Sequence, residues 1–140
     1  TMKKIGYIGH KPLGVIAAIE SMKENKFKEL NERVINWAKD KGILDKATSL
    51  DQINKTIEEV HETQLALLHK SLGVETFTTE KGNIAFVDDE IKDGFGDILV
   101  TVLIGCKMQG LDPLYCLETA LEVIEKRKGK MINGTFVKEA

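Results

Sequence analysis

The sequence is poor in cysteine, proline and aromatic residues. Its 140 residues include two Cys, two Pro and one Trp, and only 6% are aromatic. Two cysteines are too few for a disulfide framework, and neither Cys106 nor Cys116 has a second Cys or His at the spacing of a zinc site. We interpret both as packing residues in a reducing compartment and expect a cytoplasmic protein.

Long apolar runs and a basic excess are also missing. The longest apolar run, Ile98 to Cys106, is far shorter than the roughly 20 residues that cross a bilayer. Lys3 and Lys4 precede an apolar stretch that is too short for a signal peptide. The net charge is −2, whereas proteins that bind nucleic-acid backbones usually carry a basic excess over one face. The sequence therefore predicts no membrane role and no nucleic-acid polymer as partner.

The hydrophobic residues, 42% of the chain, recur mostly at helical spacing. We expect an all-α fold, with helices over residues 27–41, from Thr48 or Ser49 to about Leu72, from Asp88 or Asp89 to Gly110, and from Asp112 to Gly129. Residues 74–87 are expected to form a loop or short hairpin, and Asn133-Gly134 a turn. The expected organisation is an N-terminal extension, residues 1–26, and a helical domain, residues 27–140.

The N-terminal extension is predicted to contain a short strand within residues 4–9 and a helix over residues 12–24. Its Gly6-x-x-Gly9 spacing suggests a phosphate loop only weakly, since the rest of such a motif is missing, and a plain turn is favoured.

Two acidic rows stand out on the second and third expected helices: Glu58-Glu59-x-x-Glu62 and Glu90-x-x-Asp93-x-x-x-Asp97. Most charge runs are solvated faces. Here, however, Lys55 and Lys92 are the only basic residues nearby, and like charges three and four residues apart destabilise a helix. A cation between the rows would relieve this repulsion. Ligands that are all carboxylates favour Mg²⁺, with Mn²⁺ as a substitute, and magnesium commonly bridges to phosphate.

These residues resemble the MazG-like nucleotide pyrophosphohydrolases, all-α relatives of the dimeric dUTPases. The resemblance covers roughly residues 27–138. Three segments carry it: Ile57-Glu58-Glu59-Val60-His61-Glu62, the stretch from Ile91 to Val100, and the stretch from Arg127 to Lys138, the latter two in the style of phage and Gram-positive members. The resemblance implies a four-helix bundle, completed by assembly into a homodimer or homotetramer. It also implies cleavage of nucleoside triphosphates to monophosphate and pyrophosphate, in nucleotide-pool housecleaning.

The sequence departs from the family pattern at Gly94, where many members have glutamate three residues before the final aspartate. Asp93 or Glu90 would have to supply the lost carboxylate. The metal ligands are therefore expected from Glu59, Glu62 and Asp97 first, then Asp93, then Glu90, with Glu58 or Glu62 as general base. Gly94 and Gly96 are each unfavourable in a helix by about 1 kcal/mol, which indicates close approach of a ligand or of a neighbouring helix.

The remaining candidates would bind substrate. Lys126, Arg127, Lys128 and Lys130 could neutralise phosphate charge, although a basic last turn also suits the helix dipole. Lys55 either pairs with Glu59 or reaches a phosphate. Trp37 and Phe95 could stack on a base, but a single tryptophan at helical spacing is more often a core residue. The rival hypothesis is a non-catalytic nucleotide-binding or assembly protein of the same fold, motivated by Gly94.

Overall fold

The computed structural model describes residues 7–8 and 11–140, and these divide into two compact units, residues 1–46 and 47–140. Most of the described residues are helical, as expected, and three two-stranded antiparallel sheets are added to the helices. Gly6 and Gly9, which suggested a phosphate loop, lie outside the described residues, as does His10. Of the expected N-terminal strand, Tyr7–Ile8 is found as β1, paired with β2 at Lys11–Pro12.

The first unit consists mainly of one long helix. Helix α1 spans Leu13–Asp40, and the short α2 spans Ile43–Lys46 and packs against it. Gly42 separates the two helices with a φ of 77°, a value that suits glycine and ends α1 as the sequence predicts. Two helices were expected in place of α1. The chain shows no helix break near residue 26, and Pro12 lies before the helix, where proline is tolerated.

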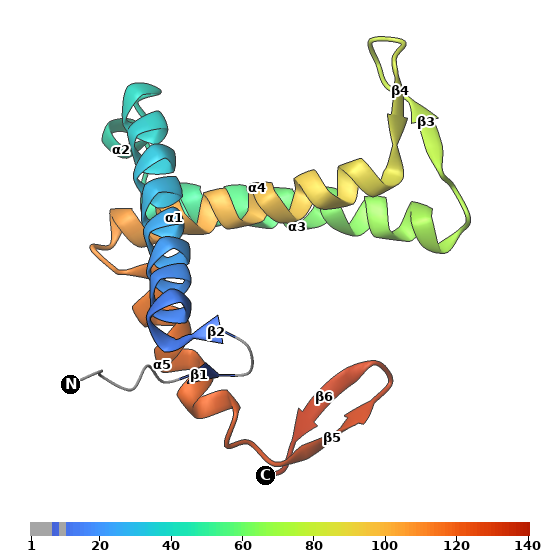
Figure 1. The fold of residues 1–140 in the computed structure, drawn as a ribbon. Coiled ribbons are helices and arrows are strands. Elements are labelled where there is room, and N and C mark those ends of the chain that lie inside the picture. The colour runs from blue at the N-terminus through green and yellow to red at the C-terminus, as the bar shows by residue number, and fades with distance from the viewer. Residues whose placement is uncertain (1–6, 9–10) are drawn as a thin grey trace, which may run out of the picture. The chain divides into compact units, whose positions relative to one another are not determined.

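In the second unit, α3 (Ser49–Ser71) and α4 (Val87–Met108) run antiparallel, side by side (Figure 1). Thr48 begins α3 with a capping box: its Oγ1 accepts from Asp51 N at 3.1 Å, while Asp51 Oδ2 accepts from Thr48 N at 2.8 Å. Gly73 follows α3 at a φ of 80°. The expected cap and glycine stop are therefore both confirmed.

A hairpin joins these two helices, the more ordered of the two alternatives expected for residues 74–87. Strands β3 (Thr76–Thr78) and β4 (Ile84–Phe86) pair in register, with Phe77 opposite Ala85. The ring of Phe77 lies 6.3 Å from that of His69 on α3. Helix α4 begins at Val87, directly after β4 and without a side-chain cap, just before the start that was expected at Asp88 or Asp89.

Asp112 caps α5 (Pro113–Ile124), where its Oδ1 accepts from Leu114 N at 2.9 Å. Strands β5 (Gly129–Ile132) and β6 (Thr135–Lys138) form the C-terminal hairpin around Asn133 and Gly134, both at positive φ. The expected end of the last helix at Gly129 is wrong. The ladder reaches back as far as Lys128, whose carbonyl accepts from Glu139 N at 2.8 Å, so this backbone pairs with a strand.

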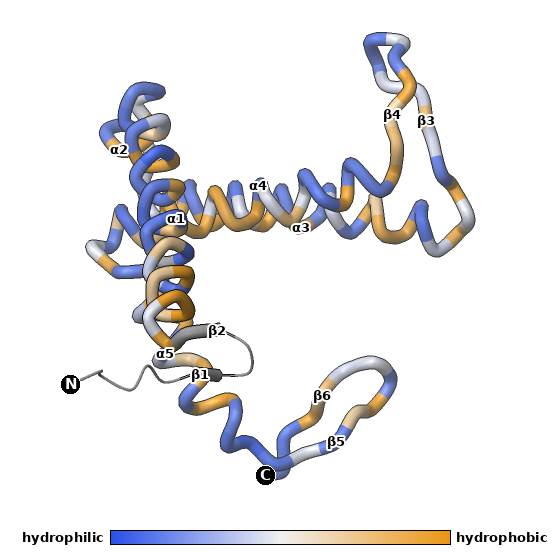
Figure 2. The backbone as a smooth tube through the Cα atoms, in the orientation of Figure 1, coloured by the Kyte–Doolittle hydropathy of each residue, from blue (hydrophilic) through white to orange (hydrophobic). Residues whose placement is uncertain are grey.

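Very little of either unit is buried. The buried hydrophobic residues are Ala38 in the first unit and Ala66, Val87 and Ile104 in the second, and α5 contains no buried residue. Helix α4 is largely hydrophobic from its middle to its C-terminal end (Figure 2). Within the described chain no single helix is long and apolar enough to cross a membrane, although α4 and α5 together, bent by 102°, reach that length and composition.

Candidate functional site

Two contacts define how α3 and α4 are aligned. Near the middle of the pair, Thr63 on α3 meets the backbone of α4 at Gly94. Near one end, the buried Gln52 donates from Nε2 to Thr101 O at 3.0 Å, and its Cγ approaches Gly105. Because the helices are antiparallel, Glu59, one turn before Thr63, lies level with Asp97 and Ile98, one turn after Gly94.

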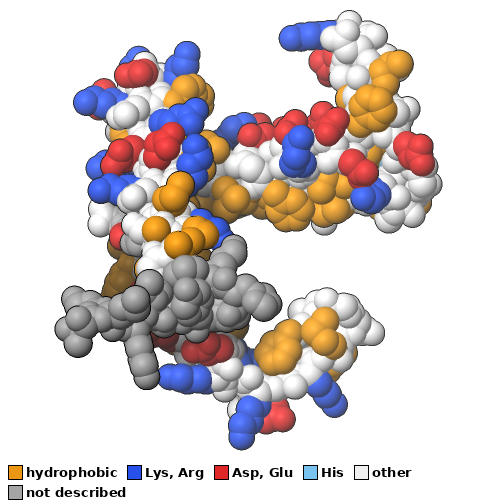
Figure 3. All heavy atoms as spheres, in the orientation of Figure 1, with side chains coloured by type: hydrophobic (Ala, Val, Ile, Leu, Met, Phe, Trp, Pro, Cys, Tyr) orange, Lys and Arg blue, Asp and Glu red, His pale blue; other side chains and the backbone are white. Residues whose placement is uncertain are grey.

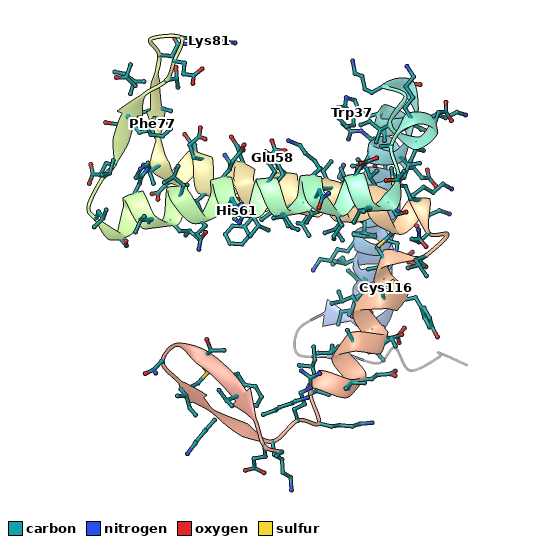
Figure 4. The ribbon with its side chains drawn as sticks, turned by 180° about the vertical axis from the view of Figure 1, so that it is seen from behind. Trp37, Glu58, His61, Phe77, Lys81 and Cys116 are labelled. Carbon is teal, nitrogen blue, oxygen red and sulfur yellow. The ribbon has the colours of Figure 1, made fainter. Side chains whose placement is uncertain are left out.

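Both acidic rows lie on the same side of this pair. Successive residues are rotated by about 100° around a helix axis. On α3 the first row lies to one side of Thr63, with Glu59 at about 40°, Glu62 at about 100° and Glu58 at about 140°. On α4 the second row lies to the same side of Gly94, with Glu90 at about 40°, Asp97 at about 60° and Asp93 at about 100°. Figure 3 shows the outcome as red side chains along the upper edge of the α3–α4 pair, and Figure 4 places Glu58 on that edge. We call this edge the acidic side.

The opposite edge of the pair is apolar. On α3 it carries Ile53, Ile57 and Val60, and on α4 Phe95, Leu99 and Val102, with exposed fractions from 40% to 63%. Figure 3 shows hydrophobic side chains in orange along the lower edge of the pair. We call this edge the apolar side. A pair of amphipathic helices therefore presents its carboxylates in one direction and its unburied hydrophobic residues in the other.

Among the described residues, Lys55 is the one close positive partner of the first acidic row. Its Nζ lies 2.8 Å from Glu58 Oε1 and 2.9 Å from Glu59 Oε1. The side chain of Glu59 is only 12% exposed, whereas that of Glu58 is 58% exposed. The hydrogen bonds to Glu58 and then Glu59 raise the pKa of Lys55 above its ordinary range. Of the two roles expected for Lys55, the structure shows the ion pair with Glu59.

Among the described residues, no ion pair involves Glu90, Asp93 or Asp97 of the second acidic row. The ion pairs of α4 lie at its start, where Lys92 Nζ is 3.7 Å from Asp89 Oδ1 and Lys70 Nζ is 2.7 Å from Asp88 Oδ1. In the part of the chain that the structure describes, no three Asp, Glu, His or Cys side chains converge closely enough to hold one metal ion. Glu59, Glu62, Glu90, Asp93 and Asp97 thus share a side of the pair without forming a compact ligand cluster.

The two glycines of α4 have different surroundings. A Cβ placed on Gly94 would collide with Thr63 Oγ1 and crowd the Thr63 Cβ and Cγ2, at 3.1 and 3.2 Å. A Cβ on Gly96 would meet nothing within 4 Å. Of the two explanations expected for Gly94, close approach of a neighbouring helix is therefore the one that the structure shows, and helix packing does not explain Gly96.

Trp37 is on α1, in the first unit, and is 49% exposed, so it is not the core residue that its spacing favoured. Lys126, Arg127 and Lys128 follow α5, and Lys130 is in β5. All four are exposed, and the structure gives them no ion pair among the described residues.

Sequence reasoning missed the role of two buried polar residues, Gln52 and Thr63, in aligning the helices. Gln52 on α3 donates to Thr101 O on α4. Thr63 donates to Glu59 O within α3, and its side chain packs against Gly94 of α4. Their positions on the α4-facing stripe of α3, among apolar and small residues, were the available signal.

Comparisons with protein-family models, with curated proteins and with solved structures found no match to this chain. A functional assignment therefore depends on the residues and their arrangement.

Proposed function

We propose that the protein is a metal-dependent nucleoside triphosphate pyrophosphohydrolase, which converts NTP or dNTP and water to the monophosphate and pyrophosphate. The observation that carries the proposal is the common side of the two acidic rows, with Glu59 and Asp97 level with each other across the α3–α4 pair. Carboxylates from facing helices are a known way to build a metal site in a helical bundle. The MazG-like resemblance of these segments supports the same activity.

The donor set fits a hard divalent cation. Every candidate ligand is a carboxylate, and the Lys55 ammonium between Glu58 and Glu59 indicates that this part of the acidic side accommodates a positive group. Glu59, Glu62 and Asp97 would hold Mg²⁺ or Mn²⁺, with Asp93 or Glu90 in place of the family carboxylate at position 94. When bound, the ion would neutralise phosphate charge and lower the pKa of a water molecule.

The other residues would act on the substrate directly. Glu58 or Glu62 would accept the proton of the attacking water, since both are exposed on the acidic side. Lys55, once its carboxylate partners turn to the cation, would be free to contact a phosphate. Lys126 and Arg127 would contribute further positive charge. The expected physiological role is the removal of surplus or non-standard nucleotides.

A substrate panel tests the proposal. Purified protein with Mg²⁺ or Mn²⁺ should release pyrophosphate from at least one canonical or modified (deoxy)nucleoside triphosphate, and EDTA should abolish the release. We expect Glu62→Gln and Asp97→Asn to reduce kcat/KM by at least about 100-fold, the usual scale for loss of an essential acid–base or charged group. Glu80→Gln, an exposed substitution in the β3–β4 turn, should leave activity unchanged. Equal activity of wild type and Glu62→Gln would show that the site is wrong.

A second candidate function is non-catalytic binding of nucleotide or metal by the same fold. The contact between Thr63 and Gly94 favours it, because it excludes a family carboxylate at position 94 in the observed helix packing. This candidate predicts nucleotide binding by calorimetry with no turnover of any nucleotide in the panel.

We also propose that the chain assembles as a homodimer or homotetramer through the apolar side, so that two α3–α4 pairs complete a four-helix bundle. The six large hydrophobic side chains of the apolar side are each about half exposed. Covering the exposed part would contribute on the order of 1 kcal/mol per side chain, enough in sum to stabilise association. Assembly through this side would leave the acidic side open to substrate.

A further inference from the structure

The ammonium group of Lys55 lies between two carboxylates of the acidic side. Its Nζ is 2.8 Å from Glu58 Oε1 and 2.9 Å from Glu59 Oε1, so two negative charges share one positive charge. Around α3, Lys55 is about 80° from Thr63, on the same side as Glu59 and Glu62. The lysine therefore places a cation within the first acidic row.

This contact differs from an ordinary ion pair on a solvated helix surface. The more favourable order for such pairs is glutamate before lysine, and here the lysine comes first. The side chain of Glu59 is only 12% exposed, and a carboxylate with so little access to water needs a positive or hydrogen-bonding partner. Among the described residues, Lys55 is the one ion-pair partner of Glu59. The lysine thus neutralises a carboxylate that water reaches poorly.

The ammonium group is also free to leave. Among the described residues, only the two carboxylates bind it, and the Lys55 side chain is 47% exposed. A lysine stem is flexible, so other rotamers carry the ammonium group into water. Asp97, level with Glu59 across the helix pair, has no ion pair in the part of the chain that the structure describes. A divalent cation in place of the ammonium group would have this third carboxylate on the facing helix.

We propose that Lys55 is a tethered cation, which occupies the metal position of the acidic side until Mg²⁺ or Mn²⁺ displaces it. The inference rests on the proposed function, because it concerns the same metal. Glu58 and Glu59 cannot give the same oxygens to the ammonium group and to a divalent cation, so metal loading requires that the Lys55 contacts break. The ion pair therefore stabilises Glu59 in the metal-free protein and raises the metal concentration needed for loading.

Binding of Mn²⁺ to the full-length protein tests the proposal. Free Mn²⁺ is measured by electron paramagnetic resonance during titration of each variant at constant ionic strength. We expect Lys55→Gln to bind Mn²⁺ roughly three- to tenfold more tightly than wild type, the scale of charge-assisted contacts between partly exposed groups. Lys92→Gln serves as the control. It removes the same charge from α4, where Lys92 pairs with Asp89, and should stay within about twofold of wild type.

Lys55→Arg separates the charge of the side chain from its shape. Arginine keeps the positive charge and can contact both carboxylates, so this variant should bind Mn²⁺ no more tightly than wild type. Tighter binding by Lys55→Arg, equal to that of Lys55→Gln, would overturn the proposal. Because the arginine variant keeps a partner for Glu59, it also provides the test if Lys55→Gln does not fold.

Urea unfolding gives a second readout. Without metal, Lys55→Gln should be less stable than wild type, because Glu59 loses its ion-pair partner. The same excess of Mn²⁺ should then stabilise Lys55→Gln more than wild type, since a ligand stabilises a folded protein according to its affinity. An equal gain in both proteins would contradict displacement of the lysine.

The outcomes separate this inference from the proposed function. Equal Mn²⁺ affinity of wild type, Lys55→Gln and Lys92→Gln, or weaker binding by Lys55→Gln, would overturn the inference and leave the metal site in place. If Mn²⁺ binds to none of these proteins, the proposed metal site is wrong and the inference falls with it.

Discussion

At the scale of single residues, the contact between Thr63 and Gly94 determines what α4 can place against α3. Thr63 is buried, and its Oγ1 donates to Glu59 O at 2.8 Å, so its side chain is held on the α4-facing stripe. Any side chain at position 94 would enter the space that Thr63 fills. A glutamate there would need either a smaller residue at 63 or a wider separation of the helices.

Gly94→Ala should therefore destabilise the protein although alanine is the better helix former. The propensity gain of about 1 kcal/mol opposes a packing cost of about 1–3 kcal/mol, and we expect a net loss on the order of 1 kcal/mol in the free energy of unfolding. Urea denaturation followed by circular dichroism measures the difference. Thr63→Ala in the same chain should recover most of the packing cost.

Gly96→Ala is the matched control for this prediction. Its Cβ would meet nothing within 4 Å, so only the propensity term remains and the variant should be more stable by up to about 1 kcal/mol. Equal effects of the two alanine substitutions would show that the Thr63 contact does not restrict position 94.

The sequence indicated that Gly94 needed a physical reason, but it could not choose between a ligand and a helix. That choice depends on which residue of α3 lies opposite, and a helical repeat specifies the face of a residue without specifying its partner. The same limit applies to Trp37, whose helical spacing suggested a core position although nearly half of its surface is exposed.

At the scale of elements, the helix ends were the most predictable feature. Each of these ends depends on a local requirement of the backbone, for a capping side chain or for a glycine at positive φ, that can be recognised from the residue type. The residues are Thr48, Gly42, Gly73 and Asp112 with Pro113. The end of α5 was not predictable in this way, because strand pairing from Glu139 back to Lys128 competes with continued helix. Helix α4 begins directly after a strand and without a side-chain cap, so its start at Val87 lies before the aspartates from which the sequence predicted it.

The capping box of α3 predicts a dependence of stability on acid. The hydrogen bonds from Thr48, first from its backbone and then from its side chain, lower the pKa of Asp51 below its ordinary value. A carboxyl group whose pKa is lowered in the folded state stabilises the protein at pH values above its pKa in the unfolded state, which is about 3.9. This contribution to stability is lost as the pH falls through the pKa of the folded state. Asp51→Asn should therefore be less stable than wild type at pH 7, and the difference should shrink below about pH 4.

Urea midpoints for wild type and Asp51→Asn, measured from neutral pH down to acid, check this prediction. A stability difference that stays constant across the range would mean that the charge of Asp51 does not contribute and that only the shape of the cap matters.

At the scale of the whole molecule, the apolar side exposes large hydrophobic side chains to water, which is unfavourable for the isolated chain. Leu99 is its most exposed residue, at 63%, and therefore makes few contacts that a substitution would remove. If two copies meet through the apolar side, Leu99→Glu should weaken the association strongly, because a charge would be buried without a partner. Light scattering at micromolar concentration should then give the monomer mass for the variant and a larger mass for wild type.

Leu65→Glu is the matched control for assembly. Leu65 is also an exposed leucine, at 53%, but it lies outside the apolar side, about 80° around α3 from Ile57, the nearest member, and about 120° from Ile53. It should keep the wild-type mass. A monomeric wild-type protein would count against assembly altogether, and loss of assembly in both variants would place the interface elsewhere.

The amphipathic character of α3 and α4 was readable from the sequence, but the shared direction of their acidic rows was not. The spacing within each row indicates only which face of its own helix the carboxylates occupy. The common side follows from the antiparallel alignment, which depends on the contacts of Gln52 and Thr63 with particular residues of α4, and the spacing within α3 does not specify those partners. The proposed assembly is equally hard to predict, because hydrophobic residues that a partner would cover follow the same sequence pattern as core residues.

The packing of Thr63 against Gly94 also restricts the order in which mutations can accumulate. A lineage that keeps this helix separation and gains a carboxylate at position 94 must first shorten residue 63, because the reverse order passes through a crowded intermediate. Serine at 63 would not be enough, since it keeps the oxygen that collides, whereas alanine removes it. Among natural variants that keep this helix separation, side chains larger than glycine at position 94 are therefore expected together with alanine or glycine at position 63.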